Sequence, residues 1–186
     1  MDFDKVVEKR QSIRKFKNKT PNWRDIVKAI DIARQIPLAG NVNTLKFLLV
    51  MDKDKIEKIA EAVDQQCVFD TNMLIVVCSD ESQLEKRFDE RGRIYTRQQA
   101  GAAIQTLLLK LTDMKLASCW VGAFDDNQIR KTLSIPKKIL IEAVIPIGYE
   151  KEKCSKKRKM AVENLIYCDK WDQKRLSPEN SDPKRF

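Results

Sequence analysis

A group of residues able to bind an anion lies near the start of the chain. The stretch Arg10-Gln11-Ser12-Ile13-Arg14 places two guanidinium groups and a hydroxyl within five residues. The N–H fork of an arginine matches the oxygens of a phosphate, and the serine hydroxyl adds a donor. The stretch predicts a phosphate clamp. The alternative is a pair of surface arginines at a helix end.

A turn-forming loop, Pro37-Leu38-Ala39-Gly40-Asn41-Val42-Asn43, carries a second set of polar groups. Gly40 and Asn41 favour a turn, and the amides of Asn41 and Asn43 can each donate and accept hydrogen bonds. The pyrimidine edge of a flavin ring requires such groups. The alternative is an ordinary loop whose side chains cap its neighbours.

Two further segments could complete such a site. Trp120-Val121-Gly122 puts a large aromatic beside a glycine, which lets backbone N–H groups approach a flat ring closely. The alternative is a core tryptophan at a strand end. Lys156 and Arg158, in a basic triplet near the C-terminus, could reach the same phosphate, or they could form a solvated basic surface.

The composition narrows the chemistry. The chain has no histidine, which excludes Ser-His and Cys-His nucleophiles. Its five cysteines lack C-x-x-C spacing, so a zinc or iron–sulfur site has little support and we expect no bound metal. No G-x-G-x-x-G or P-loop motif is present, which argues against a Rossmann or P-loop nucleotide site. An enzyme with this sequence would therefore take its chemistry from other side chains or from a cofactor.

The net charge of +9 suits an anionic cofactor, nucleic acid or a membrane surface. A basic nucleic-acid-binding module stays open as an alternative, although no recognition motif supports it. The apolar runs are too short to span a bilayer, and the N-terminus lacks the pattern of a secretory signal. We expect a cytoplasmic protein without membrane or nucleic-acid partners.

Hydrophobic periodicity predicts an α+β domain with a central sheet flanked by helices. Three apolar runs, at residues 45–51, 73–78 and 139–149, predict strands. A strand or turn is expected at 118–121, and a surface helix or lid at 81–95. Helices are expected before Arg10, from Trp23 to about Ala33, at 55–63, at 96–114 and from a capping box at Asp125.

Taken together and in order, these motifs resemble the nitroreductase family of FMN-dependent oxidoreductases. The family pattern R-x-S-x-R appears at 10–14, a P-S-A-G-N-like segment at 37–47, a small-residue helix at 99–109, a G-L-G-x-x-W-h-G-x-F-like segment at 115–124, and a K-x-R pair at Lys156 and Arg158. The resemblance covers about residues 5–160 of one domain, 1–186, with 161–186 as a C-terminal extension.

The resemblance implies a homodimer that binds FMN at its interface, takes hydride from NAD(P)H and passes two electrons to a nitroaromatic, quinone or similar small acceptor by ping-pong kinetics. It implies a mixed or antiparallel sheet and a C-terminal segment that wraps the partner. The implied phosphate ligands are Arg10, Ser12, Arg14, Lys156 and Arg158, and the implied ring and ribityl contacts are Pro37, Leu38, Ala39, Gly40, Asn41, Asn43 and Trp120.

The backbones of Val121 and Gly122 would donate toward the flavin N5 edge, with no catalytic side chain required. Ring contacts from Asn43 and from residues 69–72 could come from the second subunit. The chain departs from the family pattern at Leu38, Asn43, Thr44-Leu45 and Ala117, which alters ring contacts but leaves the phosphate residues in place. Oxygen-dependent flavin chemistry and reductive dehalogenation are the alternative reactions on the same fold.

Overall fold

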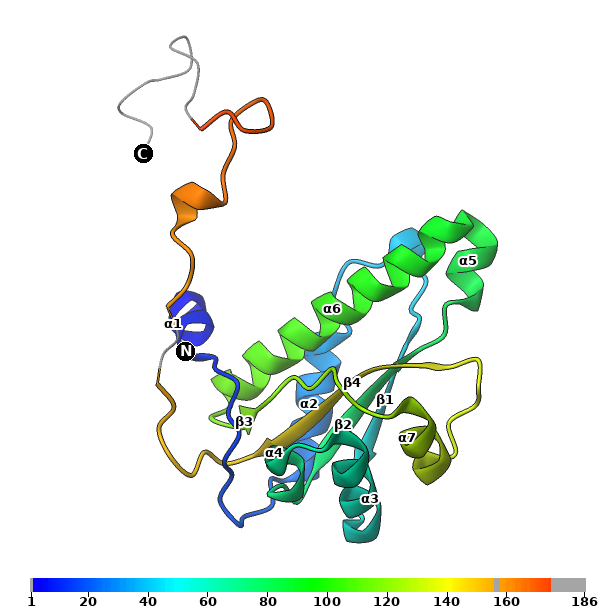
Figure 1. Ribbon diagram of the computed structural model, residues 1–186, viewed down its shortest axis with the longest axis vertical. Helices are drawn as coiled ribbons and strands as arrows, with labels where there is room; N and C mark the ends of the chain where they lie inside the picture. Colours follow the sequence, from blue (N-terminus) through cyan, green and yellow to red (C-terminus); the bar gives the residue numbers. More distant parts are fainter. Residues whose placement is uncertain (1, 156–157, 175–186) are drawn as a thin grey trace. The chain divides into compact units, whose positions relative to one another are not determined.

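The computed structural model describes residues 2–155 and 158–174. The chain divides into two compact units, residues 1–154 and 155–186. The first unit contains the sheet and all of its covering helices (Figure 1). In the described part of the second unit, a short 3-10 helix, η2 (Val162–Asn164), is followed by Tyr167, whose ring packs at a tilt against that of Trp171 with 4.8 Å between the ring centroids.

The first unit is built on a four-stranded sheet with strand order β1-β2-β4-β3. The strands are β1 (Leu45–Val50), β2 (Leu74–Ser79), β3 (Ala117–Ser118) and β4 (Leu140–Gly148), and each neighbouring pair is antiparallel. β2 lies between β1 and β4, and all of its residues are buried. Because both faces of β2 are buried, its sequence is continuously apolar. A strand with one exposed face would instead alternate apolar and polar residues.

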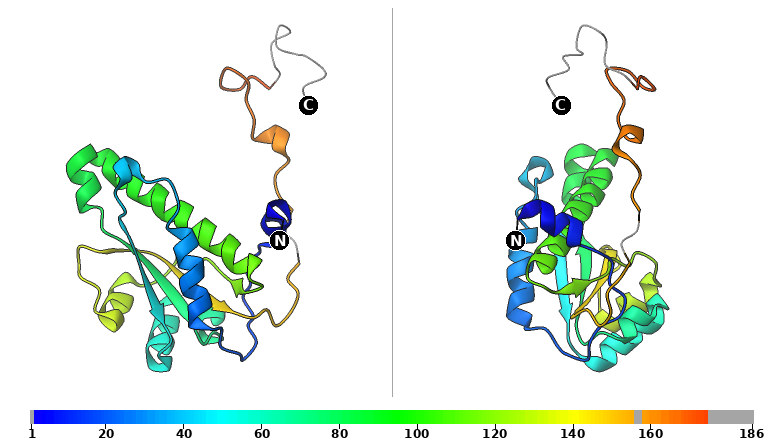
Figure 2. Two further views of the ribbon diagram at one scale, coloured as in Figure 1. Left: turned by 180° about the vertical axis from the view of Figure 1, so that it is seen from behind. Right: turned by 90° about the vertical axis from the view of Figure 1, so that its left-hand side faces the viewer.

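One face of the sheet is covered by α2 (Trp23–Ala33) and α6 (Glu90–Asp113). Ile26 and Ala29 of α2 and Leu107 of α6 pack on the same side of β2 as Ile75 and Val77. The right-hand view of Figure 2 shows the sheet on edge with α2 on one side. Asn22 caps α2 by accepting from the Arg24 N–H at 3.1 Å, as expected of a helix start there.

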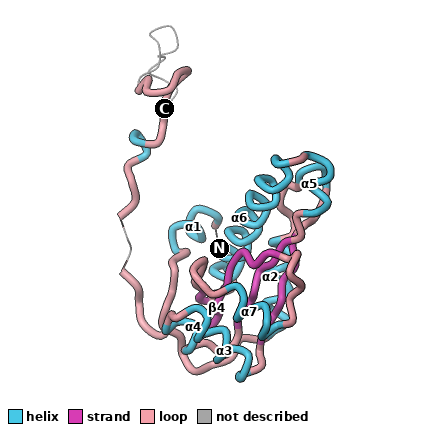
Figure 3. The backbone as a smooth tube through the Cα atoms, turned by 45° about the vertical axis from the view of Figure 1, so that its right-hand side comes forward, coloured by secondary structure: helices cyan, strands magenta, loops and turns pink. Residues whose placement is uncertain are grey.

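The opposite face is covered by α3 (Lys53–Val63), α4 (Gln66–Phe69) and α7 (Asp126–Leu133), which Figure 3 shows grouped together. Their core residues meet the alternate side chains of β2, Leu74, Val76 and Cys78. Asp125 caps α7 by accepting from the N–H groups of Asn127 and Gln128. The result is a three-layer α/β/α sandwich with a separate apolar cluster on each face of the sheet.

Three elements complete the unit: α1 (Phe3–Lys9), the 3-10 turn η1 (Ala39–Asn41) and α5 (Ser82–Phe88). The surface helix expected over residues 81–95 is in fact α5 together with the first turns of α6. Gly92 allows this tight junction, because a Cβ at that position would meet the Leu84 carbonyl oxygen at 2.2 Å. α4 was not predicted.

Candidate anion and cofactor site

The stretch from Arg10 to Arg14 is extended and fastened to the edge of the sheet. It follows α1 directly, and Ser12 forms a parallel bridge with Ser118 of β3. The Ile13 N–H donates to the Ser118 carbonyl at 2.9 Å, and Ile13 is buried in the core. Two segments more than a hundred residues apart in sequence are therefore held side by side.

Side chains alternate along an extended chain, so Arg10, Ser12 and Arg14 belong to one side of the segment. All three act on one atom, the sulfur of Cys119. A hydrogen bond from the Cys67 thiol is the main cause that lowers the pKa of Cys119, followed by the charge of Arg14, the Ser12 hydroxyl and the charge of Arg10. Arg10, Ser12 and Arg14 therefore each favour negative charge on the Cys119 sulfur, and their binding of a phosphate stays a prediction.

A cavity of about 450 Å³ opens beside this point. Arg14 and Cys67 form part of its wall, and the other residues lining it are Lys15, Gln65, Gln66, Asp70, Lys151 and Glu152. Lys15 is engaged by Glu152 at 2.7 Å, whereas Arg14 makes only a long contact to its own Ser12 carbonyl at 3.4 Å. Within the described residues, Arg14 forms no ion pair, so its guanidinium is available to an anion.

Residues near Phe69–Asn72 line this same cavity through Asp70. We expected ring contacts from this segment to come from a second subunit. In the structure, the segment lies beside Arg14 of its own chain. The reason is that Thr71 donates its hydroxyl to the Ile147 carbonyl at 2.7 Å, which fixes α4 next to the end of β4 that β3 also pairs with.

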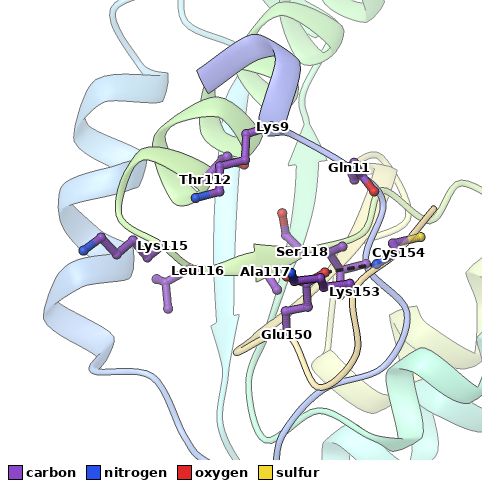
Figure 4. A pocket seen from close by; sticks show the side chains of 11 residues that line it. Lys9, Gln11, Thr112, Lys115, Leu116, Ala117, Ser118, Glu150, Lys153 and Cys154 are labelled. Carbon is purple, nitrogen blue, oxygen red and sulfur yellow. Dashed lines mark hydrogen bonds between the residues drawn. The ribbon is translucent and has the colours of Figure 1, made fainter. Parts of the chain in front are cut away.

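A second cavity, of about 430 Å³, lies beside the same segment, and Figure 4 shows the side chains that line it. Gln11 and Ile13 line it, together with Lys9, Thr112, Lys115, Leu116, Ala117, Ser118, Glu150, Lys153 and Cys154. The Gln11 side-chain oxygen is buried and, within the described part of the chain, has no hydrogen-bond partner. This cavity shares no lining residue with the cavity beside Arg14.

The Trp120–Gly122 segment contains one correction. Val121 exchanges backbone hydrogen bonds with Val144, each at 3.0 Å, so its N–H cannot donate to a flavin and that prediction is wrong. Gly122 is exposed, and a Cβ there would meet no atom within 4 Å. Trp120 is 40% exposed, which excludes a core tryptophan. An open aromatic surface and an open backbone therefore lie directly after Cys119.

The Pro37–Asn43 loop is a tight turn. Gly40 and Asn41 both have positive φ, at 57° and 58°, a conformation that glycine and asparagine tolerate best. The Gly40 carbonyl accepts from Arg87 of α5 at 2.9 Å. The Asn43 side chain accepts from the Leu45 N–H at 2.9 Å, so its oxygen caps β1.

The loop lies at the far end of α6 from the arginine segment (Figure 1). Pro37, Leu38 and Ala39 line a cavity of about 410 Å³ with Tyr95, Gln98, Gln99 and Ala102 of α6. The arginine segment meets α6 instead near Thr112. Fourteen residues of helix separate Gln98 from Thr112, about 21 Å at 1.5 Å per residue. One chain therefore does not bring these two predicted halves of the site together.

Two of the predicted phosphate ligands cannot be placed with the others. Lys156 lies outside the described residues, and Arg158 belongs to the second unit. Sequence reasoning also missed Cys67 and Gln99. Gln99 is 4% exposed and, among the described residues, neither of its side-chain polar atoms has a partner. A buried glutamine within a small-residue helix is the only signal the sequence offered.

Comparison with known proteins gives a consistent picture. A sequence model described as the nitroreductase family matches residues 7–68 and 63–149. A protein of Methanothermobacter thermautotrophicus, provisionally named NADH dehydrogenase/NAD(P)H nitroreductase, is 30% identical over 92% of this chain and 88% of its own length. The iodotyrosine deiodinase of Thermotoga neapolitana is 24% identical over 77% of this chain and 86% of its own.

Among solved structures, an FMN-dependent nitroreductase from Clostridium difficile R20291 superposes with a TM-score of 0.71 at 23% identity, covering 82% of this chain and 90% of that one. This similarity shows that the two proteins share the same three-layer fold. Over residues 2–155 and 158–174, no helix combines the length and apolar character needed to cross a bilayer.

Proposed function

Because the chain belongs to the nitroreductase family, we propose that it is an FMN-dependent oxidoreductase that takes hydride from NAD(P)H and delivers two electrons to a nitroaromatic, quinone or similar small acceptor by ping-pong kinetics. The observation that carries this proposal is the position of Arg10, Ser12 and Arg14 on one extended segment that pairs with Ser118, just before the Trp120–Gly122 segment. The names of the Methanothermobacter thermautotrophicus relative and of the solved structure support the same class of reaction.

The residues present fit a flavin phosphate. Two guanidinium groups and a hydroxyl on one side of an extended segment form the charge-assisted donor set that a phosphate requires. The Arg14 guanidinium supports the same role, because it lines the cavity of about 450 Å³ and, among the described residues, forms no ion pair. Lys156 and Arg158 are the proposed second half of this clamp.

FMN, when bound, supplies the hydride-accepting and electron-transferring chemistry. The chain's own residues would bind and orient it. Arg14 would also stabilise negative charge in the adjoining cavity. Trp120 offers an apolar surface beside the ring, and the open backbone of Gly122 allows a flat ring to approach. No side chain needs to move a proton, which agrees with a sequence that has no histidine.

We further propose that the Pro37–Asn43 loop reaches the flavin from a second copy of the chain. Within one chain the loop is about 21 Å along α6 from the arginine segment. A two-fold dimer that packs the outer side of α6 against its symmetry mate would bring each loop to the partner's arginines. Gly101 is open on this helix, because a Cβ at that position would meet no atom within 4 Å, and it therefore permits close approach of another backbone.

Reductive dehalogenation is the second candidate reaction, favoured by the similarity to the Thermotoga neapolitana deiodinase. It would use the same flavin site and differ only in the acceptor. The test compares the reduced protein on the two kinds of acceptor. Release of iodide from an iodinated phenol that is faster than reduction of nitroaromatics or quinones would favour reductive dehalogenation.

The test is an anaerobic titration of the purified protein reconstituted with FMN. The proposal expects NADH or NADPH to bleach the flavin absorbance, and a quinone or nitroaromatic added afterwards to restore it. A protein that does not retain FMN, or whose flavin neither nucleotide reduces, would refute the assignment.

A further inference from the structure

A buried amide on α6 lacks the hydrogen bonds that its burial requires. Gln99 is 4% exposed, and among the described residues neither the oxygen nor the nitrogen of its side-chain amide has a partner. An unsatisfied buried polar group is costly, so nearly all such groups in folded proteins are hydrogen-bonded. Both polar atoms of one side chain are unsatisfied here, which points to a partner from outside the chain.

Gln99 lines the cavity of about 410 Å³ between α6 and the Pro37–Asn43 loop. Tyr95, Gln99 and Ala102 are three or four residues apart on α6, so they present one face of the helix to the cavity. Small-molecule sites in proteins have volumes of about 300–1,000 Å³. Every residue that lines the cavity is uncharged, although the chain has a net charge of +9, so the cavity favours a neutral ligand.

The loop side of the cavity leaves the Gln99 amide unsatisfied. Pro37 has no N–H to donate. The Leu38 carbonyl already accepts from the Asn41 N–H at 3.2 Å. The Ala39 carbonyl accepts from the next N–H along the chain at 3.1 Å. The hydrogen-bonding groups of the turn are therefore used to hold the turn itself.

Both walls of the cavity are fixed before any ligand binds. Arg87 of α5 donates to the Gly40 carbonyl at 2.9 Å and so holds the loop. On the helix side, the ring of Tyr95 packs edge to face against that of Phe88, with 5.4 Å between the ring centroids. Tyr95 therefore offers a rigid aromatic surface to a flat ring in the cavity.

An amide side chain presents an acceptor and a donor side by side, so its best complement is a group that presents a donor and an acceptor in the same way. A primary carboxamide does this, whereas a nitro group or a quinone only accepts. We propose that the cavity binds the nicotinamide ring of NAD(P)H and that Gln99 recognises its carboxamide through two hydrogen bonds. This inference rests on the proposed function, in which the same loop reaches the flavin, and it makes Gln99 a specificity-determining residue for the hydride donor.

The experiment measures the binding of three pyridines to the purified full-length protein, incubated with FMN, by isothermal titration calorimetry. Nicotinamide should bind about tenfold more tightly than 3-acetylpyridine, in which a methyl group replaces the NH₂ and leaves the Gln99 oxygen without a donor. Nicotinate should also bind more weakly than nicotinamide, because it brings a negative charge into a cavity that is lined by uncharged residues.

Gln99→Met, which keeps the length of the side chain, should remove the preference for nicotinamide over 3-acetylpyridine. It should not lower the melting temperature, because it removes an unpaired buried amide. The matched control is Gln105→Met, since Gln105 is an exposed glutamine of the same helix that does not line the cavity. This control should keep the preference of the wild type.

Equal affinities of the wild type for nicotinamide and 3-acetylpyridine would overturn the proposal, and this comparison is decisive even if a variant does not fold. The proposal also fails if Gln99→Met keeps the preference, or if it weakens self-association in sedimentation without changing nicotinamide binding. Failure in a protein whose bound flavin NADH or NADPH still reduces would remove only this donor site. A protein that prefers nicotinamide but retains no FMN would instead refute the proposed function.

Discussion

The Ile13 N–H donates to the Ser118 carbonyl at 2.9 Å, and this bond fixes the arginine segment against the strand that leads into Cys119. It connects the N-terminal residues that we propose bind the flavin phosphate to the Trp120–Gly122 segment, where we propose that the flavin ring lies. Pairing with the edge of the sheet therefore sets the position of the arginine segment, and the arginine side chains supply the positive charge.

Replacing Arg14 by alanine should weaken FMN binding. A hydrogen bond to a charged group contributes about 1.5–3 kcal/mol, so we expect the dissociation constant to rise roughly 10- to 150-fold. Flavin fluorescence titration measures this. Arg34→Ala is the matched control, because Arg34 pairs with Asp31 on the surface of α2 at 2.6 Å and should leave the affinity unchanged. An unchanged affinity in Arg14→Ala would contradict the role of Arg14.

The reactivity of Cys119 should respond to bound anion. In the ligand-free protein its pKa is lowered by Cys67, Arg14, Ser12 and Arg10. The rate of iodoacetamide labelling at Cys119 should therefore rise with pH through a midpoint below that of an ordinary thiol. Bound FMN or inorganic phosphate places negative charge on the same arginines, so the midpoint should move to higher pH, as it should in Arg14→Ala. If neither bound anion nor the Arg14→Ala substitution moves the midpoint, the arginines do not act on the Cys119 sulfur.

A partly buried network at the end of β4 away from β3 should matter for stability. Glu142 accepts from Ser79 of β2 and pairs with Arg97 of α6, and its side chain is only 10% exposed. Glu142→Gln should lower the free energy of unfolding by about 1–3 kcal/mol in a denaturant titration. Glu152→Gln is the control: that carboxylate pairs with Lys15 on the surface, and its loss should change little. Equal effects of the two substitutions would refute the network's importance.

Asp80 should make stability depend on pH in the acid range. Its pKa is lowered by hydrogen bonds from Ser82, whose N–H donates at 3.1 Å, and by Lys138 at 3.1 Å. A carboxyl with a lowered pKa in the folded protein stabilises it above its unfolded pKa and loses this effect as pH falls through the folded value. Asp80→Asn should therefore melt at a lower temperature than wild type at pH 7, and the difference should shrink on acidification. A constant difference would exclude this linkage.

The sequence predicted most of the fold because its strongest signals are local. β1, β2 and β4 are continuous apolar runs, and the caps at Asn22 and Asp125 mark the helix starts. α4 escaped prediction because four residues are too few to show a helical period. The start of α6 was misjudged because its first turns are charged and solvent-facing.

The site was only partly predictable for a different reason. The motif at Arg10–Arg14 is local, so the sequence alone predicts it as an anion clamp, and that role stays a prediction. The use of the Val121 N–H by Val144 depends on strand pairing between distant segments. No spacing rule within one segment encodes such contacts.

Mixed dimers test the central claim, a flavin site assembled from two chains. Arg14→Glu and Ala39→Trp should each abolish FMN binding in a homodimer, because one removes the clamp and the other fills the loop side. A heterodimer of the two variants can be isolated through two different affinity tags. Each proposed site takes its arginines from one chain and its loop from the other, so one site of this heterodimer carries both substitutions and the other carries neither. Pairing Arg10→Glu with Arg14→Glu is the control, since each of its two sites keeps one defect.

We predict that the Arg14→Glu/Ala39→Trp heterodimer binds one FMN per dimer, while both homodimers and the control heterodimer bind none. A heterodimer that stays free of FMN although both variants are folded, or a wild-type chain that binds FMN as a monomer, would contradict the account.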